Sequence, residues 1–523
     1  MEVPNSPNLE PVPSPSNTTS SGKWRMDNVA RPPIARNLTI RPMSQEDFDT
    51  VLGKVFKAYD VRATYPSPLD EIVAWRIGYA TARWLTERAA KDGVDHPKMR
   101  HIVVGRDMRK SSPSLANALK RGIRDFGAHV IDVGMVDTPM TYFAINHFNC
   151  AGGIEVTASH NPAQYNGFKV SRVLAKPVGT GSGLEVIRDY AAECDESRVE
   201  RRAGREEHVN LWSAYRDHLL RLLHPSVLDG TSRLCVAIDA SNGMAGTMAP
   251  KVLDGVAGIE YQAINFDNSS GEFVHEPNPL VESNLASVRA VVLAGKMDFG
   301  VCFDGDADRC VIVDESAQPI GCDLLLAALA SEALKTAPGA AVVYDLRSSR
   351  SVREAIIEAG GVPVESRVGH VFMKARLAET CAPIGGELSG HFYFADMFNA
   401  DSGIRAFLAV ASLLASKKLP LSKIIEPYQR YQQSGEVNFE NSDKMGALAA
   451  LRAAYPSGKF TELDGLSLDA GEWWCNVRLS NTEPLLRLNL EARRVRRKRP
   501  GQAGKRARRR RRLGRSYLGR HGA

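Results

Sequence analysis

Residues 101–107 read His-Ile-Val-Val-Gly-Arg-Asp, and this stretch determines the fold class that the sequence predicts. Its apolar run is typical of a buried β-strand, and the Gly-Arg-Asp that follows indicates a loop at the strand's carboxyl end. Similar stretches occur at residues 234–239 (Leu-Cys-Val-Ala-Ile-Asp) and 341–345 (Ala-Val-Val-Tyr-Asp). These strands lie about one domain length apart, which suggests a unit that occurs three times.

Helical patterns lie between these strands. Asp70 precedes a stretch in which Ile72, Val73 and Ile77 recur along one side, so Asp70 is predicted to begin a helix. Strands that alternate with helices predict α/β layers. We therefore predict three related α/β domains and a shorter fourth unit, with the boundaries 43–204, 205–318, 319–425 and 426–492.

The two ends of the chain differ from this body. Residues 1–42 are rich in Pro, Ser and Asn and are predicted to be disordered. Residues 493–523 hold fifteen Lys and Arg and no acidic residue, so the remainder carries a net charge of −8 although the whole chain carries +7. This basic tail is also predicted to be disordered, and such a run allows non-specific binding to nucleic acid.

The composition argues against several classes of protein. Hydrophobic residues make up 43% and charged residues 24%, which is ordinary for a globular protein. No apolar run approaches the roughly 20 residues of a membrane helix, and the amino-terminus lacks the features of a signal peptide. The eight cysteines form no Cys-x-x-Cys pair, so neither a zinc site nor a disulfide framework is indicated. A reduced, cytoplasmic protein is expected.

The first chemical motif follows an apolar strand that ends at Val156. Residues 157–162 read Thr-Ala-Ser-His-Asn-Pro. This composition predicts a loop and places Ser159 on an exposed turn at the strand's carboxyl end, where α/β proteins bind ligands. His160 and Lys169 could supply the proton acceptor and the charge stabilisation that a hydroxyl nucleophile needs. A polar loop with a capping serine is the alternative.

The second motif is a cluster of carboxylates. Residues 304–309 read Asp-Gly-Asp-Ala-Asp-Arg and follow the apolar run 301–303. Carboxylates at spacing two are expected to point the same way only if the backbone stays roughly extended, and such a cluster repels itself unless it holds a cation. An EF-hand loop is disfavoured, because Arg309 occupies the position that needs Gly and residues 310–313 read as a strand. A solvated acidic turn is the other alternative.

The two loops can be linked through phosphate chemistry. Three carboxylates leave an octahedral Mg²⁺ short of ligands, and a phosphate oxygen could complete its shell. A phosphorylated Ser159 would supply such an oxygen, and Arg309 could hold an adjacent one. This hypothesis predicts that the serine loop and the carboxylate loop lie side by side.

Two further motifs are suited to a sugar phosphate. Residues 385–391 read Gly-Gly-Glu-Leu-Ser-Gly-His, and Glu387 and Ser389 could pair with sugar hydroxyls. Residues 478–484 read Arg-Leu-Ser-Asn-Thr-Glu-Pro, a set of donors that suits a phosphate dianion. Each motif taken alone is explained equally well by a turn.

Together the four motifs resemble those of the α-D-phosphohexomutase superfamily, and within it the phosphomannomutase/phosphoglucomutase group. They occur in the family's order and cover about residues 51–492. The resemblance implies three α/β domains and a smaller α+β domain around a central cleft. It also implies an enzyme that interconverts hexose 6-phosphate and hexose 1-phosphate through a phosphoserine, with Mg²⁺ as the cofactor and hexose 1,6-bisphosphate as the intermediate and activator.

The resemblance assigns roles by position. Ser159 matches the phosphoserine and, with Asp304, Asp306 and Asp308, the Mg²⁺ ligands. His160, Lys169, Arg62 and His370 are the further catalytic candidates, for proton transfer or charge stabilisation. The positions matched to substrate binding are Tyr59, Arg309, Glu387, Ser389, His391, Arg478, Ser480, Asn481 and Thr482.

The loop around Leu388 favours a particular hexose. Residues 385–394 and 400–403 are most similar to phosphomannomutase sequences, so mannose is expected, with glucose as a second substrate. Phosphoglucosamine mutases usually carry Gln in place of Leu388, so that activity is disfavoured. It is kept as one alternative. A degenerate relative whose basic tail binds nucleic acid is the other. Sugar phosphates are the expected partners of a monomer or dimer without membrane association.

Overall fold

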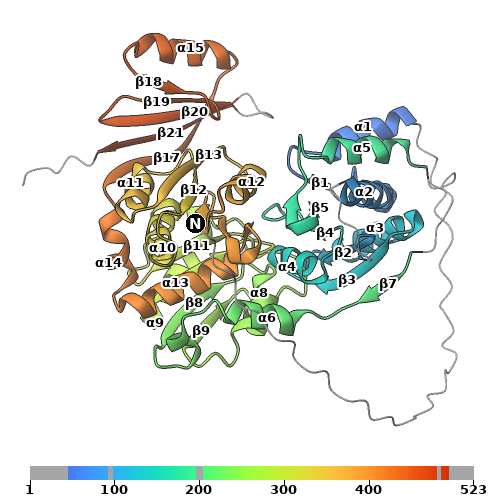
Figure 1. Cartoon of the computed structure of the whole chain (residues 1–523), viewed down its shortest axis with the longest axis horizontal. Helices are drawn as coiled ribbons and strands as arrows, with labels where there is room; N and C mark the ends of the chain where they lie inside the picture. The colour runs from blue at the N-terminus through green and yellow to red at the C-terminus, as the bar shows by residue number, and fades with distance from the viewer. Residues whose placement is uncertain (1–44, 92–97, 196–203, 480–484, 494–523) are drawn as a thin grey trace, which may run out of the picture. The chain divides into compact units, whose positions relative to one another are not determined.

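The computed structural model describes residues 45–91, 98–195, 204–479 and 485–493. The two ends that were predicted to be disordered lie outside this part of the chain. This holds for all of residues 1–42 and for residues 493–523 except Arg493. Four β-sheets organise the described residues (Figure 1). None of the described helices combines the length and the apolar character that a membrane span requires.

The first sheet has seven strands and a parallel centre. Its spatial order is β1-β5-β4-β2-β3-β7, with β6 paired to β5. Strand β2 is parallel to β3 and β4, whereas β5 is antiparallel to β4 and β1. The strands are β1 (Val61–Thr64), β2 (His101–Arg106), β3 (His129–Met135), β4 (Gly152–Val156), β5 (Tyr165–Arg172), β6 (Lys176–Pro177) and β7 (Glu206–His208).

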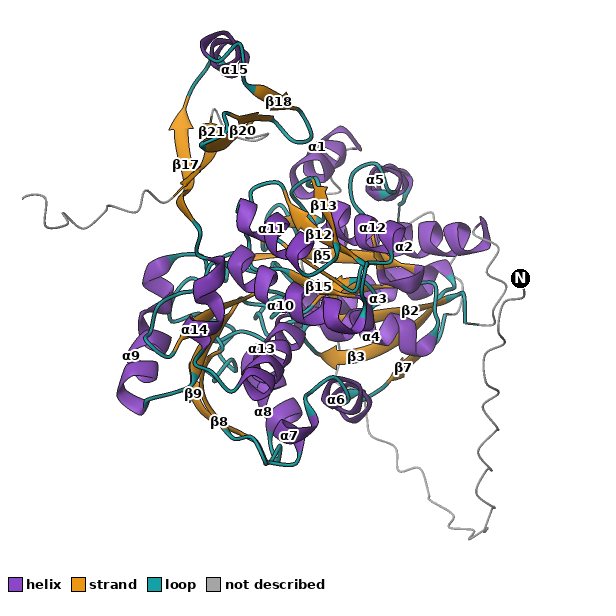
Figure 2. Ribbon diagram, turned by 60° about the vertical axis from the view of Figure 1, so that its left-hand side comes forward, coloured by secondary structure: helices purple, strands orange, loops and turns teal. Residues whose placement is uncertain are grey.

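Helices cover both faces of this sheet (Figure 2). Ile102 and Val104 of β2 pack in the core that contains α2, α3 and α5, whereas Val103 points into the core that contains α4. The Val73 amide donates to Asp70 Oδ1 at 2.8 Å, so the predicted helix start at Asp70 is confirmed. The helices are α1 (Gln45–Val55), α2 (Glu71–Lys91), α3 (Ser112–Phe126), α4 (Thr138–Phe148) and α5 (Leu184–Glu193).

The second sheet has four strands in the order β11-β10-β8-β9. Its strands β8, β9 and β10 are parallel, and β11 returns antiparallel to β10. They span β8 (Leu234–Asp239), β9 (Ile259–Ile264), β10 (Phe299–Phe303) and β11 (Cys310–Asp314). The accompanying helices are α6 (Trp212–Leu220), α7 (Pro225–Leu228), α8 (Ala245–Leu253) and α9 (Ala286–Gly295).

The third sheet repeats this plan, with a parallel centre and an antiparallel edge. Its order is β13-β12-β14-β15-β16, and β12 is parallel to β13 and β14. The strands are β12 (Ala341–Asp345), β13 (Val362–Ser366), β14 (Ile384–Gly386), β15 (Phe392–Phe394) and β16 (Ala400–Asp401). The helices are α10 (Cys322–Thr336), α11 (Arg350–Glu358), α12 (His370–Thr380), α13 (Gly403–Lys417) and α14 (Leu421–Ile425).

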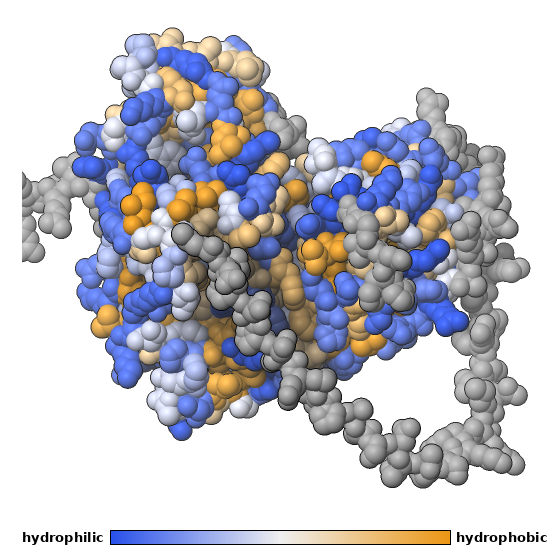
Figure 3. Space-filling model, in the orientation of Figure 1, coloured by the Kyte–Doolittle hydropathy of each residue, from blue (hydrophilic) through white to orange (hydrophobic). Residues whose placement is uncertain are grey.

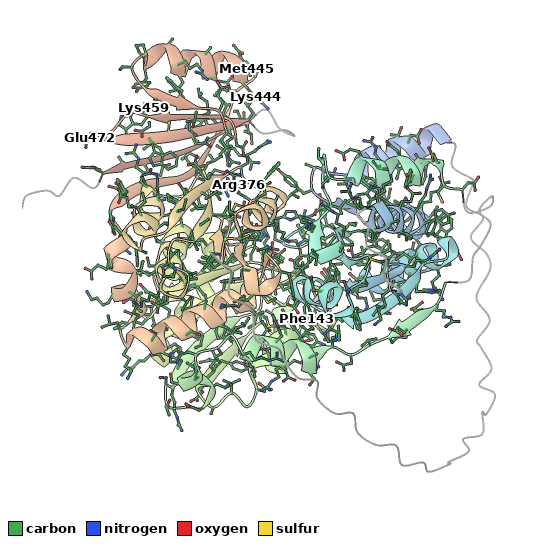
Figure 4. The ribbon with its side chains drawn as sticks, in the orientation of Figure 1. Phe143, Arg376, Lys444, Met445, Lys459 and Glu472 are labelled. Carbon is green, nitrogen blue, oxygen red and sulfur yellow. The ribbon has the colours of Figure 1, made fainter. Side chains whose placement is uncertain are left out.

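The fourth sheet is antiparallel throughout, in the order β17-β21-β20-β19-β18. Helix α15 (Lys444–Ala454) lies along one face, where Arg452 sits over the Phe460 ring (Figure 1). The helix contributes no fully buried side chain, and Met445 is 67% exposed (Figure 4). The strands are β17 (Tyr431–Glu440), β18 (Lys459–Thr461), β19 (Leu466–Asp469), β20 (Trp473–Leu479) and β21 (Leu485–Arg493).

The predicted fold class is confirmed: three α/β units of related plan precede a smaller α+β unit. The three apolar stretches found in the sequence become β2, β8 and β12. The residue boundaries proposed for the domains stay predictions. All eight cysteines are free thiols, and the face seen in Figure 3 is largely hydrophilic with apolar residues interspersed.

Candidate active site

The serine loop connects β4 to β5. Ser159 has a φ of 51°, in the left-handed region, and its amide donates to Thr157 Oγ1 at 2.9 Å. The expectation of an exposed turn is wrong, because Ser159 is only 4% exposed. The carboxylate loop packs directly against it: a Cβ atom on Gly305 would lie 2.4 Å from the Ser159 carbonyl oxygen. Ser159 therefore lies within the protein rather than on its surface.

The Ser159 hydroxyl has two polar neighbours. Its Oγ lies 3.3 Å from His160 Nδ1 and donates to Asp304 Oδ2 at 3.2 Å. Burial, together with the nearby Arg309 and Arg62, lowers the pKa of His160 to about 2. The imidazole is therefore neutral at physiological pH, and it can accept a hydrogen bond but carries no positive charge.

The three carboxylates converge, but not in the way that the sequence suggested. The oxygens of Asp304, Asp306 and Asp308 lie within 4.8 Å of one another. The backbone between β10 and β11 forms a turn rather than an extended strand, and Ala307 has a φ of 60°. The expectation that the carboxylates converge only on an extended backbone is thus wrong, because the turn itself brings the side chains together.

These carboxylates fit a divalent cation. Oδ1 of Asp306 and Oδ1 of Asp308 are buried without a hydrogen-bond partner among the described residues. Burial and the neighbouring Asp308 raise the pKa of Asp304, a repulsion that a cation would relieve. Hard carboxylate oxygens are the ligands that Mg²⁺ prefers, and Ser159 Oγ offers a further oxygen beside Asp304.

Two cationic side chains line the same region. Lys169 Nζ lies 2.6 Å from Asp306 Oδ2 and 2.5 Å from Asp308 Oδ2. Burial alone would lower the pKa of Lys169, but these carboxylates raise it above its usual value, so the group stays charged. Arg62 Nη1 donates to Asn161 Oδ1 at 2.8 Å, which ties β1 to the serine loop.

The third sheet supplies two groups near its strand ends. His370 is the first residue of α12, and burial together with Lys374 lowers its pKa to about 3. Glu387 follows β14. Its Oε1 accepts from the Gly369 amide at 2.7 Å, and its Oε2 accepts from the Tyr393 hydroxyl at 2.5 Å. Both oxygens of Glu387 are therefore held in a fixed direction.

His391 joins the third sheet to the carboxylate loop. Its Nδ1 lies 3.1 Å from Ser389 Oγ, and its Nε2 lies 3.6 Å from Asp308 Oδ1. The backbones of Arg309 and His391 form an isolated β-bridge. Arg309 Nε donates to Asp304 Oδ2 at 2.8 Å.

The fourth sheet contributes arginines from neighbouring strands. Arg478 on β20 pairs across the sheet with Arg487 on β21, and Arg478 Nη2 donates to Glu436 Oε2 at 2.7 Å. Ser480, Asn481 and Thr482 lie outside the described residues. Arg487 was not singled out in the sequence, although its position opposite Arg478 could have been inferred from two adjacent antiparallel strands.

A cavity of about 550 Å³ brings these groups together. Ten of the predicted site residues line it, and they are Tyr59, Arg62, Ser159, His160, Lys169, Asp308, Arg309, His370, His391 and Arg478. Asp304 and Asp306 lie buried beside it, and Glu387 and Ser389 both lie close to the lining residue His391, with Glu387 Oε2 3.7 Å and Ser389 Oγ 3.1 Å from His391 Nδ1. The lining also contains five charged residues that were not among the predicted site residues, namely Lys57, Asp60, Arg367, Asp464 and Arg487.

Four domain families match consecutive parts of the chain. They are described as phosphoglucomutase/phosphomannomutase alpha/beta/alpha domain I (residues 53–191), domain II (213–318), domain III (322–431) and C-terminal domain (436–499). Together they span most of the part of the chain that the structure describes.

Individual proteins show the same likeness. The phosphohexose mutases of Xanthomonas campestris pv. campestris are 37% identical over 442 residues, which is 84% of this chain and 95% of the relative. The phosphomannomutase of Escherichia coli is 36% identical over 446 residues, with 84% and 94% covered. A crystal structure of a Burkholderia thailandensis phosphoglucomutase/phosphomannomutase family protein superposes with a TM-score of 0.75 at 30% identity, covering 89% of this chain and 98% of that one.

Proposed function

Because the chain belongs to the phosphoglucomutase/phosphomannomutase family, we propose that it interconverts hexose 6-phosphate and hexose 1-phosphate, with mannose as the preferred hexose. One observation carries the proposal: a serine hydroxyl, the edge of a carboxylate cluster and the cross-strand pair Arg478 and Arg487 line a single cavity. Arginines bind phosphate, and a hydroxyl beside carboxylates that fit Mg²⁺ suits phosphoryl transfer.

In the first half of the proposed reaction, phosphorylated Ser159 donates its phosphoryl group to a bound hexose monophosphate. The bond between Ser159 Oγ and phosphorus breaks, and a bond forms between phosphorus and the free O6 or O1 of the sugar. The proton of that sugar hydroxyl passes to the enzyme and ends on Ser159 Oγ. The result is hexose 1,6-bisphosphate beside an unmodified serine, so atoms and charge balance.

In the second half, the bisphosphate turns over so that its other phosphate faces Ser159. A bond forms between Ser159 Oγ and phosphorus, and the bond between phosphorus and the sugar oxygen breaks. The proton of the serine hydroxyl passes to that sugar oxygen, and the isomer leaves. Throughout, one phosphate does not react and needs a binding site of its own. Arg478 and Arg487 suit this task, because a guanidinium binds a phosphate in the same way whichever end of the sugar carries it.

The charges of the site favour particular roles for its residues. A bound Mg²⁺, held by Ser159, Asp304, Asp306 and Asp308, would neutralise charge on the transferring phosphoryl group. Lys169, which stays protonated, suits stabilisation of negative charge better than proton abstraction. His160 is neutral and close enough to accept a hydrogen bond from Ser159 Oγ. Arg62 and His370 remain the other candidates for charge stabilisation and proton transfer.

Sugar recognition is proposed to depend on Glu387 and Ser389. The Gly369 amide and the Tyr393 hydroxyl already orient the Glu387 carboxylate, so little entropy is lost when it accepts a sugar hydroxyl. Mannose and glucose differ at C2, and these two residues are expected to contact hydroxyls elsewhere on the ring. Both hexoses therefore fit the proposal, with mannose preferred.

Turnover of defined substrates tests the proposal. The purified protein is incubated with Mg²⁺ and a trace of hexose 1,6-bisphosphate, and formation of the 6-phosphate is followed from mannose, glucose and glucosamine 1-phosphates. Mannose 1-phosphate should give the highest kcat/KM, followed by glucose 1-phosphate. A preference for glucosamine 1-phosphate would replace the proposal with a phosphoglucosamine mutase. No turnover of any substrate would point to a degenerate relative, and polyanion binding by the tail would then be measured.

The arginine pair gives a sharper prediction. Arg487→Gln should raise KM for the sugar phosphate roughly 10- to 100-fold, because a charge-assisted hydrogen bond contributes about 1.5–3 kcal/mol. Steady-state kinetics measures this change. Arg452→Gln is the matched control: Arg452 also belongs to the fourth unit, but it pairs with Glu462 on α15's side of the sheet. An unchanged KM in Arg487→Gln would exclude Arg487 from phosphate binding.

A further inference from the structure

Arg109, in the loop between β2 and α3, is a buried cation to which the reaction above assigns no role. Its side chain is fully buried, and its Nε pairs with Asp107 Oδ2 at 3.0 Å. The other hydrogen bonds of its guanidinium all lead to the serine loop. Nη1 donates to the carbonyl oxygens of Pro162 (2.7 Å) and Tyr165 (3.1 Å), and Nη2 donates to those of Ser159 (2.8 Å) and Asn161 (2.7 Å).

These contacts use the full capacity of the side chain. A guanidinium has five N–H donors in a fixed planar arrangement, and each donor here has an acceptor. A lysine ammonium in the same place would have three donors and no planar fork. The loop is therefore matched to arginine in particular, rather than to any positive charge.

The serine loop has a physical need for such a partner. Its backbone is bent so that four carbonyl oxygens point at one place, and these negative dipole ends repel one another unless a cation lies between them. Ser159 itself adopts a φ of 51°, a conformation that costs about 1 kcal/mol or more outside glycine and persists only when its surroundings hold it. Arg109 supplies both the cation and the hydrogen bonds.

The guanidinium is itself held from two sides. Asp107 Oδ1 accepts from Ser112 Oγ at 2.5 Å and from the Arg109 amide at 3.0 Å, so the carboxylate is fixed. Phe273, which precedes α9 in the second unit, lies with its ring 5.1 Å from the guanidinium carbon. The clamp thus lies where the serine loop meets the unit that carries the carboxylate cluster.

We propose that Arg109 is a positioning residue that holds Ser159 in line with the carboxylate cluster for phosphoryl transfer. The proposal builds on the mutase function and adds a residue that touches neither substrate nor metal. Without the clamp the loop relaxes, and Ser159 Oγ leaves its position 3.2 Å from Asp304 Oδ2. A displacement of about 1 Å in a reacting group can cost roughly 100-fold in rate.

Two variants test the clamp through kinetics. Arg109→Met should lower kcat for hexose 1-phosphate roughly 100-fold, while KM stays within about threefold, because the phosphate-binding arginines are untouched. Arg109→Lys should recover part of kcat, since it restores the charge but only some of the hydrogen bonds. A loss confined to KM, or an unchanged kcat in Arg109→Met, would overturn the proposal.

Lys120→Met is the matched control for the loss of a buried cation. Lys120 is also buried in the first unit, and its Nζ binds Asp132 and Glu206 (2.8 Å to the latter) away from the serine loop. Equal losses of kcat in Lys120→Met and Arg109→Met would mean that both act through general destabilisation, which would also overturn the proposal.

Hydrogen exchange separates the clamp from the mutase function. Amides of residues 157–165 should exchange at least tenfold faster in Arg109→Met than in the wild type, and at wild-type rates in Lys120→Met. An unchanged exchange rate in Arg109→Met would refute the clamp even if turnover fell. If the exchange difference is found but the wild type isomerises no hexose phosphate, the clamp stands and the proposed function fails.

Discussion

Ser159→Ala should reduce mutase turnover by roughly four orders of magnitude or more, the loss expected when the nucleophile of a covalent mechanism is removed. Alanine has no oxygen to carry a phosphoryl group, so neither half of the proposed reaction can occur. The remaining site would still bind sugar phosphate, because the arginines and the Glu387 loop are untouched. Substrate affinity should therefore change far less than turnover.

Transfer of label from radioactive hexose 1,6-bisphosphate to the protein measures the nucleophile directly. The wild type should become labelled and Ser159→Ala should not. Ser171→Ala is a suitable control, because Ser171 is also buried in the first sheet but lies farther along β5. Near-normal turnover in Ser159→Ala would disprove the phosphoserine mechanism, and loss of labelling in Ser171→Ala would show that the assay reports folding instead.

The fold could be predicted from the sequence because its strands are buried on both faces. Ile102, Val103 and Val104 face two different cores, which forces a continuous apolar run rather than an alternating one. Such runs are easily recognised, and the turn residues after them locate the strand ends. The fourth unit was harder, since its strands carry Arg, Asn and Glu on one face and lack this signal.

The sequence allowed prediction of those parts of the candidate site in which several unusual residues occur within one short stretch. The serine loop, the carboxylate loop and the Glu387 loop each have such a local signature. Arg487 and Asp464 lack one. Arg487 could be placed only through its strand pairing with Arg478, and Asp464 reaches the cavity from a position that only the folded chain brings to it. The buried state of Ser159 could not be foreseen either, since it depends on Gly305, which lies far away in the sequence.

Arg109 illustrates the same limit. Its sequence context, two residues after the Gly-Arg-Asp that ends a strand, resembles that of any loop arginine. Its role becomes visible only when four carbonyl groups, at 159, 161, 162 and 165, are seen to share one guanidinium. Every residue has a backbone carbonyl group. Hydrogen bonds to these groups therefore cannot be predicted from the residue types.

Asp306→Asn should weaken Mg²⁺ binding by at least roughly 100-fold and abolish most of the turnover. The variant removes one of the charges that the ion would neutralise. Mutating a residue that only hydrogen-bonds to a metal ligand already lowers metal affinity or activity by roughly 10- to 100-fold. Loss of charge on a ligand itself should therefore cost at least as much. The effect should be large because Asp306 Oδ2 is already engaged by Lys169 (2.6 Å) and by the Thr138 hydroxyl (2.5 Å). Oδ1 is buried without a hydrogen-bond partner among the described residues and is therefore available to an ion. Calorimetric titration with Mg²⁺ gives the affinity, and turnover in EDTA, restored by Mg²⁺, gives the dependence.

Asp132→Asn is the control that makes this result specific. Asp132, Glu206 and His208 form a second group with the spacing of metal ligands, but the Lys120 ammonium already lies between its carboxylates. Both oxygens of Asp132 and of Glu206 are engaged, by Lys120, Gly134 or Arg124. Asp306 and Asp308, by contrast, each keep a buried oxygen without a hydrogen-bond partner among the described residues, beside Lys169. Asp132→Asn should therefore bind the ion like the wild type. Equal losses in both variants, or full affinity in Asp306→Asn, would place the metal elsewhere. The carboxylate cluster would then be a structural network balanced by Lys169 and Arg309, and a metal-assisted transfer from Ser159 would have to be abandoned.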